Sequence, residues 1–334
     1  MFFSKVKASS GMMLTVEAHL VTIVVPVYNG SRVIGRCLET LLNQKYTKRE
    51  VIVVNDGSTD DTKDIVKRYP VRLIDTWHGG VAHARNVGWM SAAGDIVAHC
   101  DDDAVYDPCY IENAVAHFED QSVGGVIGPH YVLNKNNFIT RCKDVERRTN
   151  FADYKPFTGW VYRRSVLEMI GGYDEKLEYG EDVDVGIRAR NAGYRIVFEP
   201  KAIWLHEEPD ALASFLRRRF RGGAGIIPFN KKYGLPTLRI RFLIWNLILA
   251  ISLILSIINI KILIVSAVLF LYILVGGLHV AKLKWLRKAI KVTNQPFYSF
   301  GWIVLDWLGS LASSLGAINR LVMERVSTRL PNSS

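Results

Sequence analysis

Short apolar runs rich in β-branched residues alternate with stretches of helical spacing over the first hundred residues, and this alternation restricts the possible folds most strongly. We expect strands at residues 21–29, 50–55, 71–74 and 96–100. We expect helices at about 33–42, 61–69 and 81–91, the first with Ser31 as its N-cap. Strands and helices in this order predict an α/β fold with a Rossmann-like, mostly parallel sheet and right-handed crossovers.

Polar residues follow three of these predicted strands. They are Tyr28 and Asn29 after the first, Asp56 to Ser58 after the second, and Asp101 to Asp103 after the fourth. Ligands of parallel α/β sheets bind beyond the carboxyl ends of the strands. These segments, distant in sequence, are therefore expected to converge on one crevice.

The acidic triplet, Asp101 to Asp103, is the most chemically distinctive of these segments. Adjacent carboxylates repel one another, so holding them together favours a bound cation. Hard oxygen ligands suit Mg²⁺ or Mn²⁺, usually shared with a phosphorylated substrate. The alternative is a solvated acidic loop, or a helix N-cap before Pro108.

Charge is unevenly distributed along the chain of 334 residues. Residues from Leu205 onward contain 17 Lys and Arg against 5 Asp and Glu, whereas the preceding residues contain 25 against 27. Basic residues beside apolar runs indicate an anionic membrane surface. A nucleic-acid binder would carry them on its folded module, so we expect no nucleic-acid partner. The four scattered cysteines form no CxxC pair, which indicates a reducing compartment and argues against a zinc site or a disulfide framework.

Two uncharged apolar stretches, 242–260 and 262–281, are each long enough to cross a hydrocarbon core of about 30 Å. We therefore predict a transmembrane hairpin at 242–281, after a basic interfacial segment at 213–241, with both ends cytoplasmic. A buried hairpin of a soluble domain is the alternative.

Within 282–334, the apolar stretch 297–318 suits a membrane-surface helix, which we favour, or a third span. Residues 1–19 form an N-terminal extension, in which we expect no signal peptide.

Four motifs, VVPVYNG, VVNDGSTDDT, GGVAHARNVG and GDIVAHCDDDA, resemble in order and spacing those of the family 2 glycosyltransferases. The resemblance covers about residues 20–207. It implies a GT-A fold at 20–212, ahead of the transmembrane helices predicted from the apolar stretches, and a divalent metal, Mn²⁺ or Mg²⁺, as cofactor.

The resemblance also implies roles on the nucleotide-sugar side. Pro26, Tyr28 and Asn29 would lie near the nucleoside, Asp56 at the edge of the base, Gly79 and Arg85 near the diphosphate, Asp101 at the ribose, Asp102 at the variable middle position and Asp103 on the metal. Alternatives remain for two of them. Asp56 also suits an Asx-turn before Gly57, and Arg85 an ordinary surface position. Ala104 stands where many relatives carry a further acidic residue.

On the acceptor side the resemblance implies Gly159, Trp160, Glu181 and Arg188, with Asp182 as general base. Without the resemblance, Asp182 would read as an acidic residue at a helix N-terminus. His206 would complete the metal site, or would be a structural histidine.

The implied activity is inverting transfer of a sugar from a UDP- or GDP-sugar to a hydroxyl of a lipid-linked or growing glycan. The apolar stretches and their basic flanks predict a location at the cell membrane, multi-pass, with the catalytic domain on the cytoplasmic face. One alternative is a polyprenyl-phosphate hexose synthase, whose phosphate acceptor needs no general base; another is a non-catalytic membrane scaffold. The long-chain synthases carry a QxxRW-like motif that is missing around Arg188, which disfavours processive synthesis.

Overall fold

A computed structural model of the chain describes residues 19–236 and 279–327. They fall into two compact units whose segments alternate along the chain. We call residues 19–128, 156–173 and 185–203 the sheet unit. Residues 129–155, 174–184, 204–236 and 279–327 form the helical unit.

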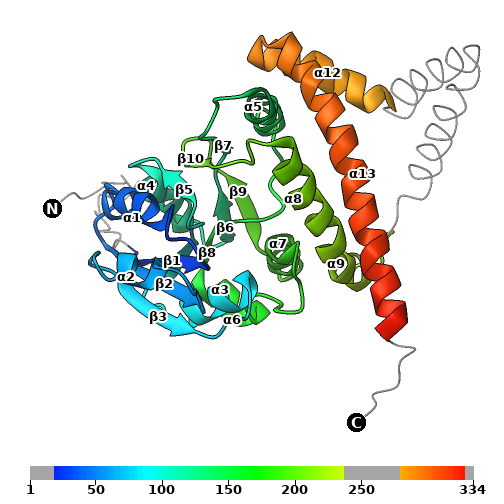
Figure 1. Cartoon of the computed structure of the whole chain (residues 1–334). Helices are drawn as coiled ribbons and strands as arrows, with labels where there is room; N and C mark the ends of the chain where they lie inside the picture. The colour runs from blue at the N-terminus through cyan, green and yellow to red at the C-terminus, as the bar shows by residue number, and fades with distance from the viewer. Residues whose placement is uncertain (1–18, 237–278, 328–334) are drawn as a thin grey trace, which may run out of the picture. The chain divides into compact units, whose positions relative to one another are not determined.

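A seven-stranded sheet of order β3-β2-β1-β4-β8-β6-β9 forms the core of the sheet unit (Figure 1). Its strands are β1 (Val21–Val27), β2 (Arg49–Asp56), β3 (Arg72–Thr76), β4 (Ile96–His99), β6 (Val123–Ile127), β8 (Val161–Arg163) and β9 (Arg195–Phe198). All neighbouring pairs are parallel except those of β8, which runs antiparallel between β4 and β6. The predicted α/β fold with a mostly parallel sheet is confirmed.

Helices connect the parallel strands, as the alternation predicted. The sheet unit contains α1 (Ile34–Leu42), α2 (Thr62–Val66), α3 (Val81–Met90), the short strand β5 (Ala104–Tyr106), α4 (Tyr110–Val115), the 3-10 helix η1 (Ala116–Glu119) and α6 (Arg164–Ile170). Helix α3 packs on β1 and β2, and a Cβ at Gly88 would collide with Val24.

The predicted N-cap role of Ser31 is wrong. Val33 takes the N-cap position, and the side chain of Ser31 bonds to Asp60, which also accepts the Ser31 N–H at 3.2 Å.

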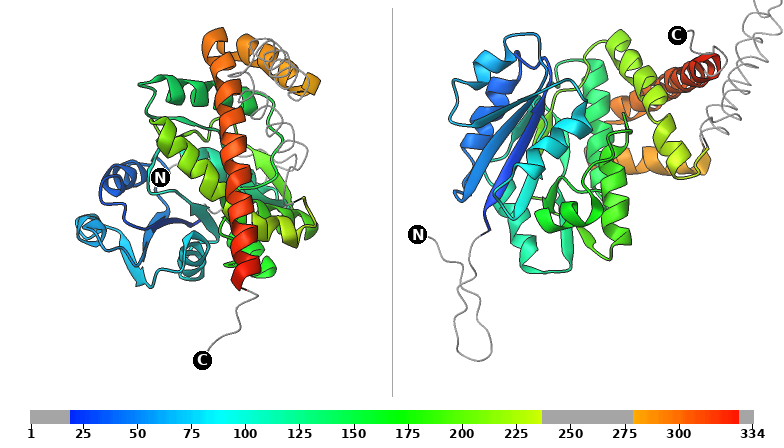
Figure 2. Two further views of the ribbon diagram at one scale, coloured as in Figure 1. Left: turned by 45° about the vertical axis from the view of Figure 1, so that its right-hand side comes forward. Right: turned by 90° about the horizontal axis from the view of Figure 1, so that it is seen from below.

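The helical unit contains the parallel strand pair β7 (His130–Val132) and β10 (Trp204–His206). Its helices are α5 (Phe138–Phe151), α8 (Leu212–Gly225), α9 (Ile227–Lys232), α12 (His279–Thr293) and α13 (Pro296–Ser327). Helix α7 (Glu181–Asn191) begins in this unit and ends in the sheet unit. Helix α13 runs along α8 and also contacts α5 and α12 (Figures 1 and 2).

Small residues let α8 and α13 approach closely. A Cβ at Gly223 would collide with the carbonyl of Ser313, and one at Gly316 with the carbonyl of Phe220. Beside these contacts lies an apolar cluster of Cys142, Phe215, Trp302 and Leu305. The two helices therefore pack as part of one helical core.

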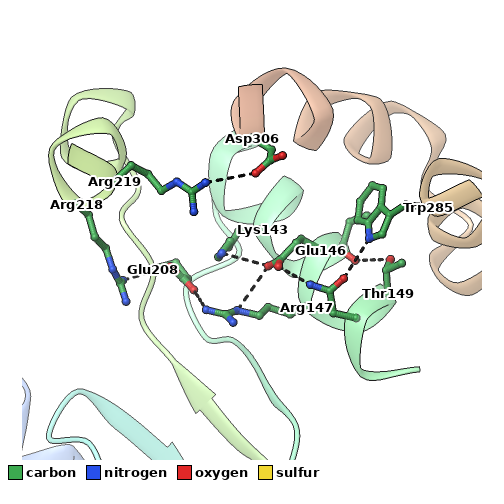
Figure 3. Close-up of polar contacts among 11 residues, drawn as sticks. Lys143, Glu146, Arg147, Thr149, Glu208, Arg218, Arg219, Trp285 and Asp306 are labelled. Atoms are coloured by element: carbon green, nitrogen blue, oxygen red, sulfur yellow. Dashed lines mark hydrogen bonds and ion pairs between the residues drawn. The ribbon is translucent and has the colours of Figure 1, made fainter. Parts of the chain in front are cut away.

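A charged network joins α5 and α8 to the segment after β10 (Figure 3). Its centre is Glu208, whose side chain is only 5% exposed. Glu208 accepts hydrogen bonds from Arg147 of α5 at 2.9 Å and from Arg218 of α8 at 3.3 Å. Burial raises the pKa of Glu208, but the cations of Lys143, Arg147 and Arg218 outweigh it and lower the pKa to about 2. Glu208 thus stays ionised and holds three segments together.

The predicted transmembrane hairpin lies outside the described residues, apart from 279–281 at the start of α12. The N-terminal extension also lies outside them, apart from His19. Within the ranges that the structure describes, the stretch 296–324 of α13 is the one helical stretch long and apolar enough to cross a membrane. The core helix of a soluble protein would meet the same criterion, and 44% of the most apolar window of α13 is buried. The choice between a surface helix and a third span stays a prediction.

The predicted interfacial segment forms α8 and α9 over its described part, up to residue 236. Four of its cations pair with carboxylates: Arg218 with Glu208, Arg219 with Asp306, Lys231 with Glu324, and Lys232 with Asp174 and Asp184. Arg217 and Arg221 are exposed. Much of the positive charge in this segment is therefore used in holding the helical unit together, and its interfacial role stays a prediction.

Candidate functional site

The loops after β1 and β2 meet at the carboxyl edge of the sheet. Asn29 has a left-handed backbone (φ 52°), and its N–H donates to Ser58 Oγ at 2.9 Å. Its side-chain oxygen accepts from the Thr59 N–H at 2.8 Å. Proline has no N–H group to donate to a neighbouring strand. The pairing of β1 with β4 ends at Val24, so Pro26 lies past it and no hydrogen bond to β4 is lost there. The predicted convergence of these strand ends is thus observed within the sheet unit.

Asp56 organises the glycine loop before α3. Its buried carboxylate accepts from the N–H groups of Gly79 at 2.8 Å and Gly80 at 3.0 Å. A third bond joins it to His78 Nδ1 at 2.9 Å. Gly57 has φ 72°, and a Cβ there would lie 2.8 Å from the backbone nitrogen of His78. The nucleotide-side roles of Asp56 and Gly79 stay predictions, and the observed contacts give both a structural part in the loop.

Two rings form a flat surface beside this loop. Tyr28 stacks on His78, with ring centroids 3.9 Å apart and planes inclined by 21°. Both side chains face solvent in part, Tyr28 at 46% and His78 at 54% exposure. A stacked pair of this kind can receive a further aromatic ring, such as a base. His78 was not predicted as a site residue, because only the fold brings it to Tyr28.

Arg85 is buried at 3% exposure, so the alternative of an ordinary surface arginine is excluded. Its guanidinium lies over the rings of Trp160, at 4.9 Å, and Tyr173, at 5.5 Å. It reaches Asp101 through Nη2, 3.2 Å from Oδ1. Stacking and the ion pair fix a positive charge directly beside the acidic triplet.

The acidic triplet offers oxygen ligands to a cation. A carboxylate oxygen of Asp101 and one of Asp103 lie within 4.8 Å of each other. A Cβ at Gly30 would collide with the carboxylate of Asp102, and the Asp101 N–H donates to the Tyr106 hydroxyl at 2.7 Å. Carboxylate oxygens at this separation are a donor set that fits Mg²⁺ or Mn²⁺.

Three predicted acceptor-side residues belong to the sheet unit. The Gly159 N–H donates to the Tyr162 hydroxyl at 2.7 Å, and Trp160 is hydrogen-bonded through its backbone to residues of β4 and β6. Arg188 donates to the carbonyls of Ile170 at 2.5 Å and Gly172 at 2.6 Å. Its guanidinium therefore holds the turn after α6, and its acceptor-side role stays a prediction.

The other predicted residues belong to the helical unit. Glu181 and Asp182 lie in the first turn of α7. Burial, and secondly the negative charge of Asp182, raises the pKa of Tyr154 to about 12. Tyr154 is therefore a protonated neighbour of the predicted base, and no motif in the sequence indicated it. His206 ends β10 as a buried residue, and its metal-ligand role stays a prediction.

Comparisons with known proteins agree with the fold and the motifs. Residues 22–171 match the family model described as Glycosyl transferase family 2. The probable glycosyltransferase YdaM of Bacillus subtilis is 30% identical over 234 residues, which cover 63% of this chain and 56% of YdaM. The glycosyltransferase AglE of Haloferax volcanii is 28% identical over 230 residues, covering 64% of this chain and 75% of AglE.

Among solved structures, the mannosyltransferase PcManGT from Pyrobaculum calidifontis, in complex with GDP-Man and Mn²⁺, shares the fold. The TM-score is 0.56 at 24% identity, over 91% of this chain and 88% of that one. The chain spans about half the length of YdaM, so the matched part is the shared domain. By the family model and the curated relatives, residues 22–171 of the chain are a family 2 glycosyltransferase domain.

Proposed function

We propose that the chain is an inverting, metal-dependent glycosyltransferase that uses a UDP- or GDP-sugar as donor. One observation carries the proposal. The stacked Tyr28–His78 pair, the Asp56 loop and the Arg85–Asp101 pair beside Asp103 all lie at the carboxyl ends of the parallel strands β1 to β4 of one sheet. An aromatic surface for a base, followed by charged groups for a ribose and a diphosphate, suits a nucleotide-sugar.

In this proposal each donor-side residue has a separate part. The Tyr28–His78 surface receives the base, Asp101 receives the ribose, and Asp103 would hold the ion. The ion, when bound, would neutralise charge that develops on the diphosphate leaving group. Arg85 keeps Asp101 in place and contributes a fixed positive charge, which needs little reorganisation during the reaction because it is buried.

Asp182 is the proposed general base. It takes the proton of the acceptor hydroxyl while that oxygen bonds to the anomeric carbon and the bond from this carbon to the diphosphate breaks. A single displacement of this kind inverts the anomeric configuration. A base with this task contributes about 10² to 10⁴ in rate.

The proposed acceptor is a lipid-linked sugar or growing glycan at the cytoplasmic face of the cell membrane. Two features of the helical unit support it. The long apolar helix α13 lies beside α8, which exposes Arg217 and Arg221. A cavity of about 500 Å³ between these helices is lined by Arg219, Asn230, Ser310, Ser313, Ser314 and Ala317. Cationic and hydroxyl groups beside small apolar residues suit a phosphate that carries an apolar chain.

The same cavity favours a second candidate, a polyprenyl-phosphate hexose synthase, in which the lipid phosphate itself is the acceptor and needs no general base. To separate the two, we would measure nucleotide release from UDP-glucose, UDP-GlcNAc and GDP-mannose by the full chain in nanodiscs. Polyprenyl phosphate and membrane glycolipid extract would be supplied in separate reactions. Glu175→Gln, an exposed change in the helical unit, is the matched control.

The glycosyltransferase proposal predicts turnover with the glycolipid extract that falls at least a hundredfold in Asp182→Asn but less than twofold in the control. Undiminished turnover by Asp182→Asn on polyprenyl phosphate would favour the synthase. Absence of turnover with every donor and acceptor would favour a non-catalytic scaffold.

A further inference from the structure

A buried carboxylate lies two residues beyond the proposed general base. Asp184, in the first turn of α7, is 0% exposed. Its Oδ1 lies 2.6 Å from Lys232 Nζ and accepts a hydrogen bond from the Tyr233 hydroxyl at 2.7 Å. A carboxylate without solvent is costly unless a cation and hydrogen-bond donors compensate it. Lys232, the last residue of α9, and Tyr233, which follows it, supply both.

Lys232 also holds the other end of the same segment. Its Nζ lies 2.7 Å from Asp174 Oδ2, so one ammonium joins the first residue of segment 174–184 to the last. Burial lowers the pKa of Lys232, but the bonds to Asp174 and Asp184 outweigh this and leave the pKa above its ordinary value. The ammonium of Lys232 is therefore charged at neutral pH.

The turn before α7 packs directly on α9. Gly180 has φ 83°, and a Cβ there would lie 2.9 Å from Phe229 Cδ2. The carbonyl of Gly180 accepts the Asp184 N–H at 2.9 Å, the first bond of α7. Phe229 in turn contacts the ring of Tyr233, at 4.8 Å between centroids. Helix α9 thus fixes where α7 begins by an ion pair, a hydrogen bond and a close packing contact.

We propose that Lys232 and Tyr233 are positioning residues that hold the first turn of α7, and with it Asp182, in its working orientation. The inference rests on the proposed role of Asp182 as general base. Neither residue touches the donor in this scheme. Loss of either therefore lowers the rate of transfer without weakening donor binding.

Two variants test the pair without leaving an uncompensated buried charge. Tyr233→Phe removes one hydrogen bond and keeps the ring. Lys232→Met combined with Asp184→Asn removes both charges of the buried pair, whereas Lys232→Met alone leaves Asp184 unpaired and can fail to fold. Lys232→Arg is the conservative rescue. Lys231→Met is the matched control, because Lys231 belongs to the same helix but pairs with Glu324 at a partly exposed site.

The first measurement is hydrogen exchange of the peptide covering 174–191 in the full chain, which needs no substrate. We expect exchange about tenfold faster in Tyr233→Phe and in the double variant, since a hydrogen bond to a charged group is lost. We expect less than a twofold change in Lys232→Arg and Lys231→Met. Unchanged exchange in both Tyr233→Phe and the double variant would overturn the proposal.

The second measurement is nucleotide release from the best donor, with Asp182→Asn as reference. We expect kcat about tenfold lower in Tyr233→Phe and the double variant, with the donor KM within twofold of wild type. A donor KM that rises in proportion would overturn the positioning role. If Asp182→Asn itself is fully active, the general-base proposal fails, and the exchange result still decides whether α9 holds α7.

Discussion

Replacing Glu208 by Gln should weaken the helical unit by an amount that follows from the charged network in Figure 3. The cations around Glu208 lower its pKa from 4.5 to about 2, although burial acts in the opposite direction. At about 1.4 kcal/mol per pKa unit, the ionised carboxylate stabilises the fold by about 3 kcal/mol at neutral pH. The side chain is only 5% exposed, so solvent screening reduces this little.

The pH dependence has a definite sign. A carboxylate whose pKa is lower in the folded state contributes its full stability above the pKa of the unfolded chain, near 4.5. That contribution disappears as pH falls toward the folded pKa of about 2. Wild-type protein should therefore lose about 3 kcal/mol between these pH values from this group alone, and Glu208→Gln should not.

Urea unfolding followed by tryptophan fluorescence, from pH 7 down to pH 3, measures both effects. Hydrogen exchange of the α5 and α8 peptides at pH 7 locates the loss. Exposed Glu175→Gln is the control and should change the free energy of unfolding by less than about 0.5 kcal/mol. If Glu208→Gln is as stable as that control at pH 7 and loses stability with the same pH slope as wild type, the reasoning about this network is refuted.

Three further changes test the sheet unit. Arg85→Lys loses the planar contact with Trp160 and Tyr173, so we expect a loss of about 1 to 2 kcal/mol in thermal unfolding; unchanged stability would contradict the stacking. His78→Ala removes half of the stacked pair and should weaken nucleotide binding about tenfold by calorimetry, with equal affinity as the contrary result. Gly88→Val should prevent the sheet unit of the full chain from folding, because its side chain would overlap Val24; a well-folded variant by circular dichroism would show that α3 can shift.

The strands and their order along the chain were predictable, because β-branched runs ending in Asn-Gly, Asp-Gly or acidic residues carry a local signal. β1, β2 and β4 lie where that signal placed them. The antiparallel insertion of β8 between β4 and β6 was not predictable, since nothing local to Val161–Arg163 specifies its partners. Ser31 failed as a cap for a related reason: its side chain and its N–H both bond to Asp60, 29 residues later.

The motifs indicated which residues follow the strand ends, but not the contacts that these residues make. The motifs selected Arg85 and Asp101, yet the burial of Arg85 depends on Trp160 and Tyr173, far along the chain. The positive charge before the apolar runs suggested a membrane surface, whereas Lys232 pairs with Asp174 and Asp184. The sequence shows where basic residues are concentrated, but which carboxylates they pair with depends on the fold.

Binding of UDP, GDP and CMP by calorimetry, with and without Mn²⁺, tests the central claim most directly. Wild-type full chain in detergent would be compared with Asp103→Asn and with exposed Asp64→Asn as control. We predict that Mn²⁺ strengthens the binding of UDP or GDP at least tenfold, that Asp103→Asn abolishes this gain, and that Asp64→Asn retains it. Binding of no nucleotide, or equal binding by Asp103→Asn in the presence of Mn²⁺, would contradict a metal-dependent nucleotide-sugar site at the acidic triplet.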